Sequence, residues 1–177
     1  MTDRPMEDTS PHGDSPHEES SSRQNRWDDG EWGDAENVEI PQTRSGARQL
    51  ALRALYWETA NPGQISEALQ QLGASCKLSA KLRFFAEQVA IAAVEHRTEL
   101  DGLIHAKATN WRPERIARLD GLILRMALAE LLYVEGVPAR VTIHEAVELA
   151  KSYGGEKSFR FVNGLLDAIA RDHKLEL

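Results

Sequence analysis

The sequence predicts an all-α domain, a compact bundle of about seven helices preceded by an acidic tail. From about residue 44 onward, apolar residues recur at helical spacing with strong helix formers between them. Proline, glycine and asparagine interrupt this pattern at short intervals, and no segment alternates apolar and polar residues as a half-buried strand does. We therefore expect helices joined by short turns, without a sheet.

Charge divides the 177 residues into two parts. Residues 1–43 contain 12 acidic residues, 3 arginines and only 7 apolar residues, which gives a net charge of −9. Residues 44–177 contain 18 basic and 16 acidic residues, and about half of them are apolar. The first part buries too little apolar surface to offset the entropy of ordering, so we predict a disordered tail. The second part has the length of a domain that folds unaided.

Two tryptophans, Trp27 and Trp32, stand out in the acidic tail. They are typical of a short docking motif, or of a strip that folds back on a basic face of the domain. A solvated spacer is the alternative, and the sequence leaves both readings open.

The first four helices are predicted from apolar stripes and from residues that break helices. One helix runs from about Ser45 to Thr59 and ends at Asn61-Pro62-Gly63. A short helix follows and stops at Gly73, and Ser79 caps a longer one. Thr98 with Asp101 opens the fourth in the manner of a capping box.

The last three helices follow a turn at Trp111-Arg112-Pro113, where proline takes the first helical position. The stretch Leu119 to Tyr133 is apolar on nearly every side, which predicts a central, enclosed helix. The capping box from Thr142 to Glu145 begins the sixth helix, and Ser158 caps the seventh.

Three residues inside these helices need a structural reason. Arg125 and Glu130 lie in the most apolar helix, where charges are tolerated only when paired, so we predict that both belong to ion pairs. Gly164 lowers helix propensity, and a close approach of two helices is the simplest explanation.

The sequence contains no pattern typical of an enzyme, a metal site or a cofactor site. Cys76 is the only cysteine, which excludes an intramolecular disulfide and fits a reducing, cytoplasmic setting. There is no glycine-rich phosphate loop, no nucleophile elbow and no zinc-protease motif. The N-terminus has no apolar signal core, and no run approaches the length of a membrane span. We predict a cytoplasmic binding protein without catalytic residues.

One group of cations marks the start of the first helix. Arg44 and Arg48 lie four residues apart, so they are expected to project from one side of it. Cations at that end oppose the helix dipole by about a few tenths of a kcal/mol. A phosphate group would supply a functional reason, because the helix amides and the guanidinium groups both favour an anion. A solvated face is the alternative.

A second group surrounds the start of the last helix, where Lys151, Lys157 and Arg160 are interleaved with phenylalanines. Phe159 fits the inward stripe, whereas Phe161 is out of phase and expected to be exposed beside Arg160. An exposed phenylalanine flanked by cations suits the stacking of a single-stranded RNA base. It is also typical of a protein contact.

Longer motifs occur in unbroken order between Arg44 and Arg171. They are Ala54-Leu55-Tyr56, Leu100-Asp101-Gly102-Leu103-Ile104, Ile123-Leu124-Arg125-Met126-Ala127, Ile143-His144-Glu145-Ala146-Val147-Glu148-Leu149-Ala150-Lys151-Ser152-Tyr153-Gly154, and Phe161-Val162-Asn163-Gly164-Leu165-Leu166-Asp167. Together they resemble the NusB family of bacterial transcription antitermination factors.

The resemblance implies two packed helical subdomains without catalytic activity. It implies binding of the boxA element of ribosomal RNA leader transcripts, together with the ribosomal protein NusE. The complex would help RNA polymerase to read through terminators, which promotes ribosomal RNA transcription. The acidic tail has no counterpart in the resemblance.

The resemblance also assigns residues to the RNA. Arg44 and Arg48 match the family's arginine-rich start, but Ser45 and Gly46 stand where further arginines are common, so this surface should bind RNA more weakly. Near the last helix, the residues on the implied RNA side are Arg160, Phe161 and Lys151, with Lys157 in a loop where RNA contact is plausible.

Two further positions match those that face NusE in the family, namely Tyr56 and Asp120. His144 replaces the usual asparagine.

The sequence also bears on two other functions. An RNA-targeting module like the one fused to some ribosomal RNA cytosine methyltransferases is disfavoured, because 177 residues leave no room for a cofactor-binding domain. A protein–protein adaptor, or a homodimer of the free protein, stays open. In either one Phe161 and the basic strip would meet an acidic partner. The tail, with its charge of −9, could compete with RNA for a basic face.

Overall fold

The computed structural model describes residues 39–108 and 116–175, and every regular element in these ranges is a helix. The helices are α1 (Arg44–Ala60), α2 (Ile65–Ser75), α3 (Ala80–Glu95), α4 (Arg97–Lys107), α5 (Arg118–Tyr133), α6 (Ala139–Tyr153) and α7 (Ser158–Asp172). The predicted all-α class is confirmed for this part of the chain.

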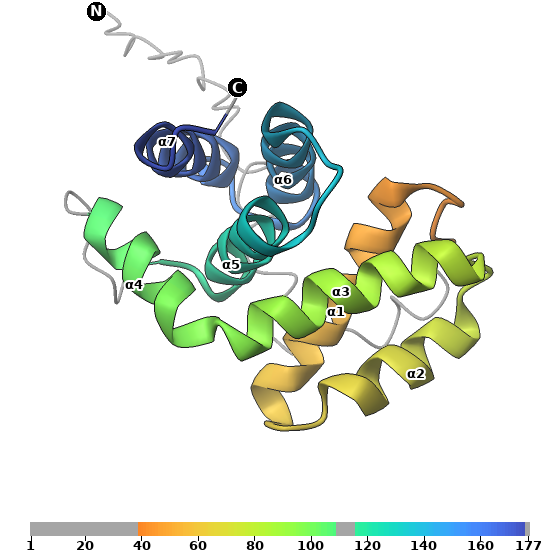
Figure 1. Cartoon of the computed structure of the whole chain (residues 1–177). Coiled ribbons are helices and arrows are strands. Elements are labelled where there is room, and N and C mark those ends of the chain that lie inside the picture. The colour runs from red at the N-terminus through yellow and green to blue at the C-terminus, as the bar shows by residue number, and fades with distance from the viewer. Residues whose placement is uncertain (1–38, 109–115, 176–177) are drawn as a thin grey trace, which may run out of the picture.

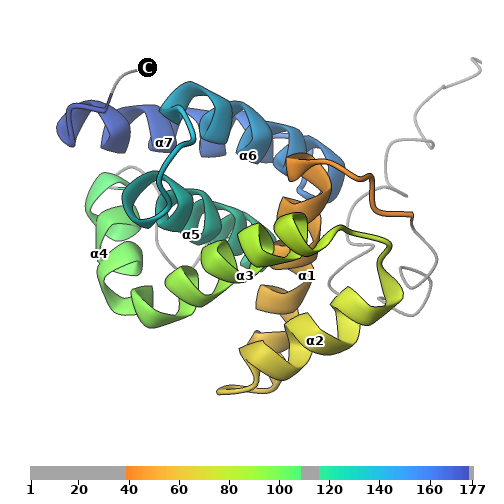
Figure 2. The same cartoon turned by 45° about the vertical axis from the view of Figure 1, so that its right-hand side comes forward.

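The helices form two packed subdomains, as predicted. The first three helices pack on one another, and the last three do the same (Figures 1 and 2). The subdomains meet where α5 packs against α1 and α3, and α4 lies against α3, α5 and α7. Because α5 contacts both subdomains, it takes the central place that its apolar sequence predicted. Ile123, Leu124 and Leu128 are fully buried there.

A buried ion pair joins the two subdomains. The Arg48 guanidinium of α1 donates from Nε to Glu130 Oε2 of α5 at 2.8 Å and from Nη2 to the other oxygen, and the two side chains are 3% and 1% exposed. From α6, Thr142 Oγ1 donates to Glu130 Oε1 at 2.8 Å, and Glu145 lies 3.5 Å from Arg48. Arg44 and Arg48 do project from one side of α1, since their guanidinium groups lie 5.1 and 5.2 Å from the centre of the same Phe85 ring, but Arg48 is buried there. Burial of its charge is tolerated because carboxylates surround it.

The two ion-pair predictions for α5 are confirmed. Glu130 pairs with Arg48, and Arg125 reaches across to α4, where its guanidinium donates to both oxygens of Asp101 at 2.9 and 3.1 Å. This second pair is half-buried and holds α4 against α5.

Helix starts follow the sequence less closely. Ser79 caps α3 by accepting a hydrogen bond from the Leu82 amide, as predicted. At the other end of a helix, α2 continues past Gly73, where the sequence predicted its stop, to Ser75. Three predicted caps are wrong, because in each case the helix begins earlier or the hydroxyl bonds elsewhere. They are Thr98, which lies inside α4; Thr142, which lies inside α6; and Ser158, which is the first residue of α7.

The ordered domain begins before residue 44. Ile40 is 5% exposed and belongs to the hydrophobic core. A Cβ atom on Gly46 would lie 1.9 Å from the Pro41 carbonyl oxygen, so only glycine lets the incoming chain cross α1 this closely. The predicted domain begins at residue 44, whereas the hydrophobic core already includes Ile40. Residues 1–38, including Trp27 and Trp32, lie outside the described residues, as does the turn predicted at Trp111-Arg112-Pro113.

The reason proposed for Gly164 is also wrong. No atom lies within 4 Å of a Cβ built on Gly164, so no neighbouring helix approaches it closely. The glycine faces open space on α7.

We predict that loss of the buried ion pair lowers the free energy of unfolding more than loss of an exposed charge does. Arg48→Ala or Glu130→Ala leaves one buried charge without its partner and should lower the free energy of unfolding by about 3–5 kcal/mol. The double variant Arg48→Met/Glu130→Leu should be less destabilised than either single variant, because no lone charge is left. Arg125→Ala, at the half-buried pair, is the control and should cost about 1 kcal/mol. Urea denaturation measures all four, and equal costs at Arg48 and Arg125 would contradict the account.

We predict opposite effects for the same substitution at two helical glycines. Gly164→Ala should raise the free energy of unfolding by about 0.5–1 kcal/mol, because it improves helix propensity in open space. Gly46→Ala should lower it by about 1–3 kcal/mol, because the new methyl group forces the Pro41 carbonyl away. Thermal unfolding checks both, and a stabilising Gly46→Ala would show that Ile40 and Pro41 do not pack as described.

Candidate nucleic-acid interface

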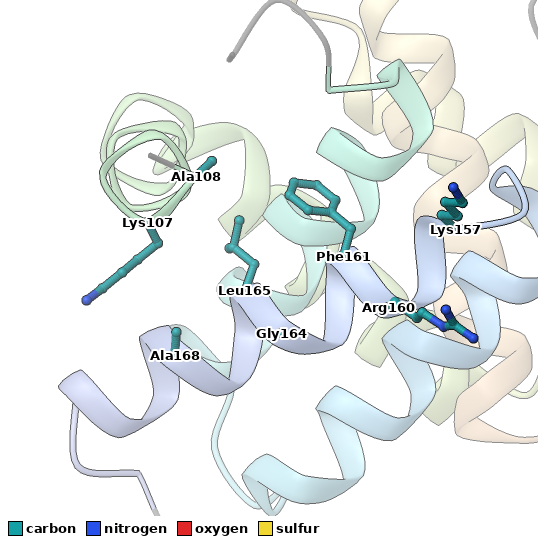
Figure 3. Close-up of a pocket in the computed structure, with 8 residues that line it drawn as sticks. All are labelled: Lys107, Ala108, Lys157, Arg160, Phe161, Gly164, Leu165 and Ala168. Carbon is teal, nitrogen blue, oxygen red and sulfur yellow. The ribbon is translucent and has the colours of Figure 1, made fainter. Parts of the chain in front are cut away.

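A shallow hollow of about 360 Å³ lies between the start of α7 and the end of α4. Lys157, Arg160 and Phe161 line it from the α7 side and Lys107 from the α4 side, with Gly164 contributing open floor. Figure 3 shows the Phe161 ring projecting from α7 toward α4, with Lys157 and Arg160 on the other side of it. The hollow therefore combines an aromatic face with positive charge, as a site for a base and its phosphates requires.

Phe161 is only partly exposed. It packs against the hydrophobic core along one side and is half-buried. The prediction of an exposed ring beside Arg160 is correct in placing it at the surface and wrong in its extent, because part of the ring packs against the hydrophobic core. The half-buried setting fixes the orientation of the ring.

The phenylalanine that is bracketed by cations is Phe159. The Lys151 ammonium lies 5.9 Å and the Arg160 guanidinium 5.5 Å from the centre of its ring. Lys151 also donates a hydrogen bond to Glu148 at 2.7 Å, which lowers the pKa of that carboxyl. Lys151 thus lies beside Phe159 and does not line the hollow.

Asp120 braces the start of α7 from within. Ser158 Oγ donates to Asp120 Oδ2 at 2.9 Å and accepts from the Gly155 amide at 2.8 Å. The turn is tight, since a Cβ on Gly154 would lie 2.5 Å from that of Ser158. Asp120 is 7% exposed, so little of its side chain is open to a partner, and its place on the NusE side stays a prediction. Its visible role is to position the turn that carries Lys157.

Burial raises the pKa of Asp120 above its ordinary value of 3.8, and the hydrogen bond from Ser158 lowers it in part. Because Oδ1 is buried with no hydrogen-bond partner among the described residues, the ionised form is only half satisfied.

Arg44 is exposed but lies outside the hollow. Its guanidinium stands 5.1 Å from the centre of the Phe85 ring, and it donates a long hydrogen bond of 3.5 Å to the Gly136 carbonyl. One turn later, Gln49 contacts the Tyr153 hydroxyl at 3.5 Å, so the first turns of α1 lie beside α6. Arg44 is therefore accessible to an anion, whereas Arg48 is buried.

Tyr56 is half-buried on α1 and packs against the core. Sequence reasoning missed Lys107 and Gly164 as members of the hollow. Lys107 pairs with Asp172 at the end of α7, and only the packing of α4 on α7 brings it near Phe161. No local signal in the sequence marks such a contact.

Within residues 39–108 and 116–175, no group of three or more His, Cys, Asp or Glu side chains is arranged to hold a metal ion. None of the helices in the same ranges has the length and apolar character needed to cross a membrane.

Comparison with known proteins places this geometry in a family. Residues 45–171 match the model of the NusB family. The transcription antitermination protein NusB of Geobacter sulfurreducens is 43% identical over 124 residues, which cover 70% of this chain and 90% of that protein. The NusB protein of Bacillus subtilis is 37% identical over 129 residues, which cover 73% and 95%.

Solved structures agree. NusB of T. maritima superposes with a TM-score of 0.65 at 31% identity, over 76% of this chain and 94% of that one. A crystal structure of antitermination factors NusB and NusE in complex with dsRNA contains a chain with a TM-score of 0.65 at 27% identity, over 73% and 96%.

We predict that Asp120 makes stability depend on pH. Its pKa is higher in the folded than in the unfolded chain, so the folded state holds the proton more tightly, and stability falls as the pH rises above about 3.8. Asp120→Asn does not ionise and still accepts the hydrogen bond from Ser158. The difference in unfolding free energy between Asp120→Asn and the parent chain should therefore move in favour of the variant from pH 4 to pH 7. A difference that is independent of pH would contradict this assignment.

Proposed function

The chain belongs to the NusB family, and from this premise we propose that it is a non-enzymatic antitermination factor. It binds boxA-type leader RNA together with the ribosomal protein NusE and promotes transcription of ribosomal RNA as part of the RNA polymerase antitermination complex in the cytoplasm. The observation that carries the proposal is the hollow at the start of α7, where Phe161 lies among Lys107, Lys157 and Arg160.

The hollow suits single-stranded RNA because it offers both parts of the recognition that such RNA needs. A base stacks on the open part of the Phe161 ring, and flanking phosphates meet the Lys157 and Arg160 side chains, which form no ion pair with any described residue. Gly164 leaves room beside the ring, since no atom lies within 4 Å of its Cβ position. Arg44 and Lys151 extend the positive surface beyond the hollow.

The RNA surface at the start of α1 is weaker than the resemblance implied. Arg48 pairs with Glu130 in the interior, and Ser45 and Gly46 carry no charge. Arg44 is therefore the only exposed cation among residues 44–48. We infer that this chain depends more on α7 and on NusE for affinity.

The proposed contact with NusE includes Tyr56 on α1. Asp120 is largely buried and acts through Ser158, which fixes the turn before α7. Since the turn carries Lys157, this brace positions the RNA surface. Coupling between NusE and RNA is reciprocal, so NusE should raise the affinity for RNA by the factor by which RNA raises the affinity for NusE.

The adaptor or homodimer function, without RNA, is the alternative that the same experiment rejects or supports. A chain that binds NusE but shows no gain in RNA affinity over NusE alone would act as an adaptor.

We predict that charge and stacking separate in the RNA titration. With NusE present and a single-stranded boxA-like RNA, Lys157→Ala/Arg160→Ala should weaken binding and make its salt dependence less steep, by about 0.7 in the log–log slope for each lost phosphate contact. Phe161→Leu keeps an apolar side chain against the core and removes the aromatic face, so affinity should fall about tenfold with the slope unchanged.

The matched control is Arg97→Ala, which removes an exposed cation of α4 that pairs with Asp101. It should change neither affinity nor slope. Parental values in both test variants would reject the RNA surface described above.

A further inference from the structure

The start of α3 presents an aromatic side chain to solvent. Phe84 is 59% exposed, more than any other large apolar side chain in the described residues. At 100° per residue, it lies in the middle of the solvent face of α3, with Lys81 on one side of it and Arg83 on the other. Its neighbour Phe85 points inward and is buried.

The cations around Phe84 have no acidic partner. Lys77, Lys81 and Arg83 are exposed and form no ion pair with any described residue, whereas Arg97, Lys107, Lys151 and Arg171 all do. The first turn of α3 contains no acidic residue, so the helix dipole adds to the positive potential. Glu87, one turn beyond Phe84, is the first acid of the helix.

Residues 40–42 are anchored beside the start of α3. Ile40 is buried in the core, and Gln42 accepts a hydrogen bond from the Ser79 amide at 3.1 Å through its Oε1. Ser79 is the cap of α3. These contacts fix the end of the acidic segment beside the first turn of the helix that carries Phe84.

The segment that precedes this anchor has the complementary chemistry. Residues 27–39 contain six acidic residues, no basic residue and both Trp27 and Trp32. Trp32 is eight residues before Ile40, a span of up to about 26 Å when extended. Phe84 lies five residues beyond Ser79, about 8 Å along the helix. The segment reaches this face easily, and the short tether gives it an effective concentration of about millimolar order.

We propose that residues 27–39 bind back onto the start of α3. A tryptophan of the segment packs on Phe84, and its carboxylates meet Lys77, Lys81 and Arg83. This contact is separate from RNA binding at α7. It covers the most exposed large apolar side chain of the described residues and neutralises the cations beside it. Non-specific polyanions are thereby excluded from this end of the molecule.

The test is ¹⁹F NMR of the full chain labelled with 5-fluorotryptophan, without RNA or NusE. The chain has four tryptophans, and Trp→Phe variants assign the lines of Trp27 and Trp32. A soluble paramagnetic agent reports how far each line is exposed to solvent. Because RNA is absent, the outcome does not depend on the proposed function.

We expect the Trp27 or Trp32 line to be protected in the parent chain. Phe84→Ala, and separately Lys81→Ala/Arg83→Ala, should lower the ratio of bound to free segment about threefold, the loss expected for one exposed aromatic or charge contact. The Trp57 line, which belongs to the core, should not move and so reports that the fold is intact.

The matched control is Lys157→Ala/Arg160→Ala, which removes a cation pair beside another phenylalanine. It should leave the Trp27 and Trp32 lines as they are in the parent chain. Three outcomes would overturn the proposal. In the first, the Trp27 and Trp32 signals are fully exposed in the parent chain. In the second, they respond to the substitutions in α7 and not to those in α3. In the third, they are protected only at concentrations where the chain dimerises.

Discussion

The buried ion pair between Arg48 and Glu130 ties the two subdomains to each other. It brings α1, α5 and α6 together at one buried point, with Thr142 and Glu145 completing the set of oxygens around the guanidinium. A charge buried to this extent needs a well-placed partner, so a shift of α1 relative to α5 would leave it unpaired at a high cost in free energy.

A second, smaller contact positions the start of α7, where we propose that RNA binds. Asp120 of α5 holds Ser158, and Ser158 holds the Gly155 amide, so the turn before α7 is anchored to the central helix. Lys157, Arg160 and Phe161 all follow within one turn. Their arrangement is therefore set before any RNA arrives, and less ordering entropy opposes binding.

The sequence predicted the helices well because each carries its own apolar stripe and its own breakers. It also showed that Arg125 and Glu130 must be paired, since charges in an enclosed helix have no alternative. It did not indicate that Arg48 and Asp120 are buried, because their burial depends on helices about 40 to 80 residues away. Lys107 was missed for the same reason. Thr142 and Ser158 match the local sequence pattern of helix caps. Their hydroxyl groups instead donate hydrogen bonds to carboxylates of another helix, those of Glu130 and Asp120. Local pattern thus predicts elements, whereas the choice between a buried and an exposed polar side chain is made by packing.

In the proposed function, flexible RNA lies on the start of α7. Ultraviolet cross-linking of a single-stranded boxA-like RNA to the full chain with NusE, followed by peptide mapping, locates this contact. The main cross-link should fall on the peptide containing Phe161, and NusE should increase its yield. Cross-links confined to α3, or spread evenly over the chain and indifferent to NusE, would place the RNA elsewhere and reject the proposal.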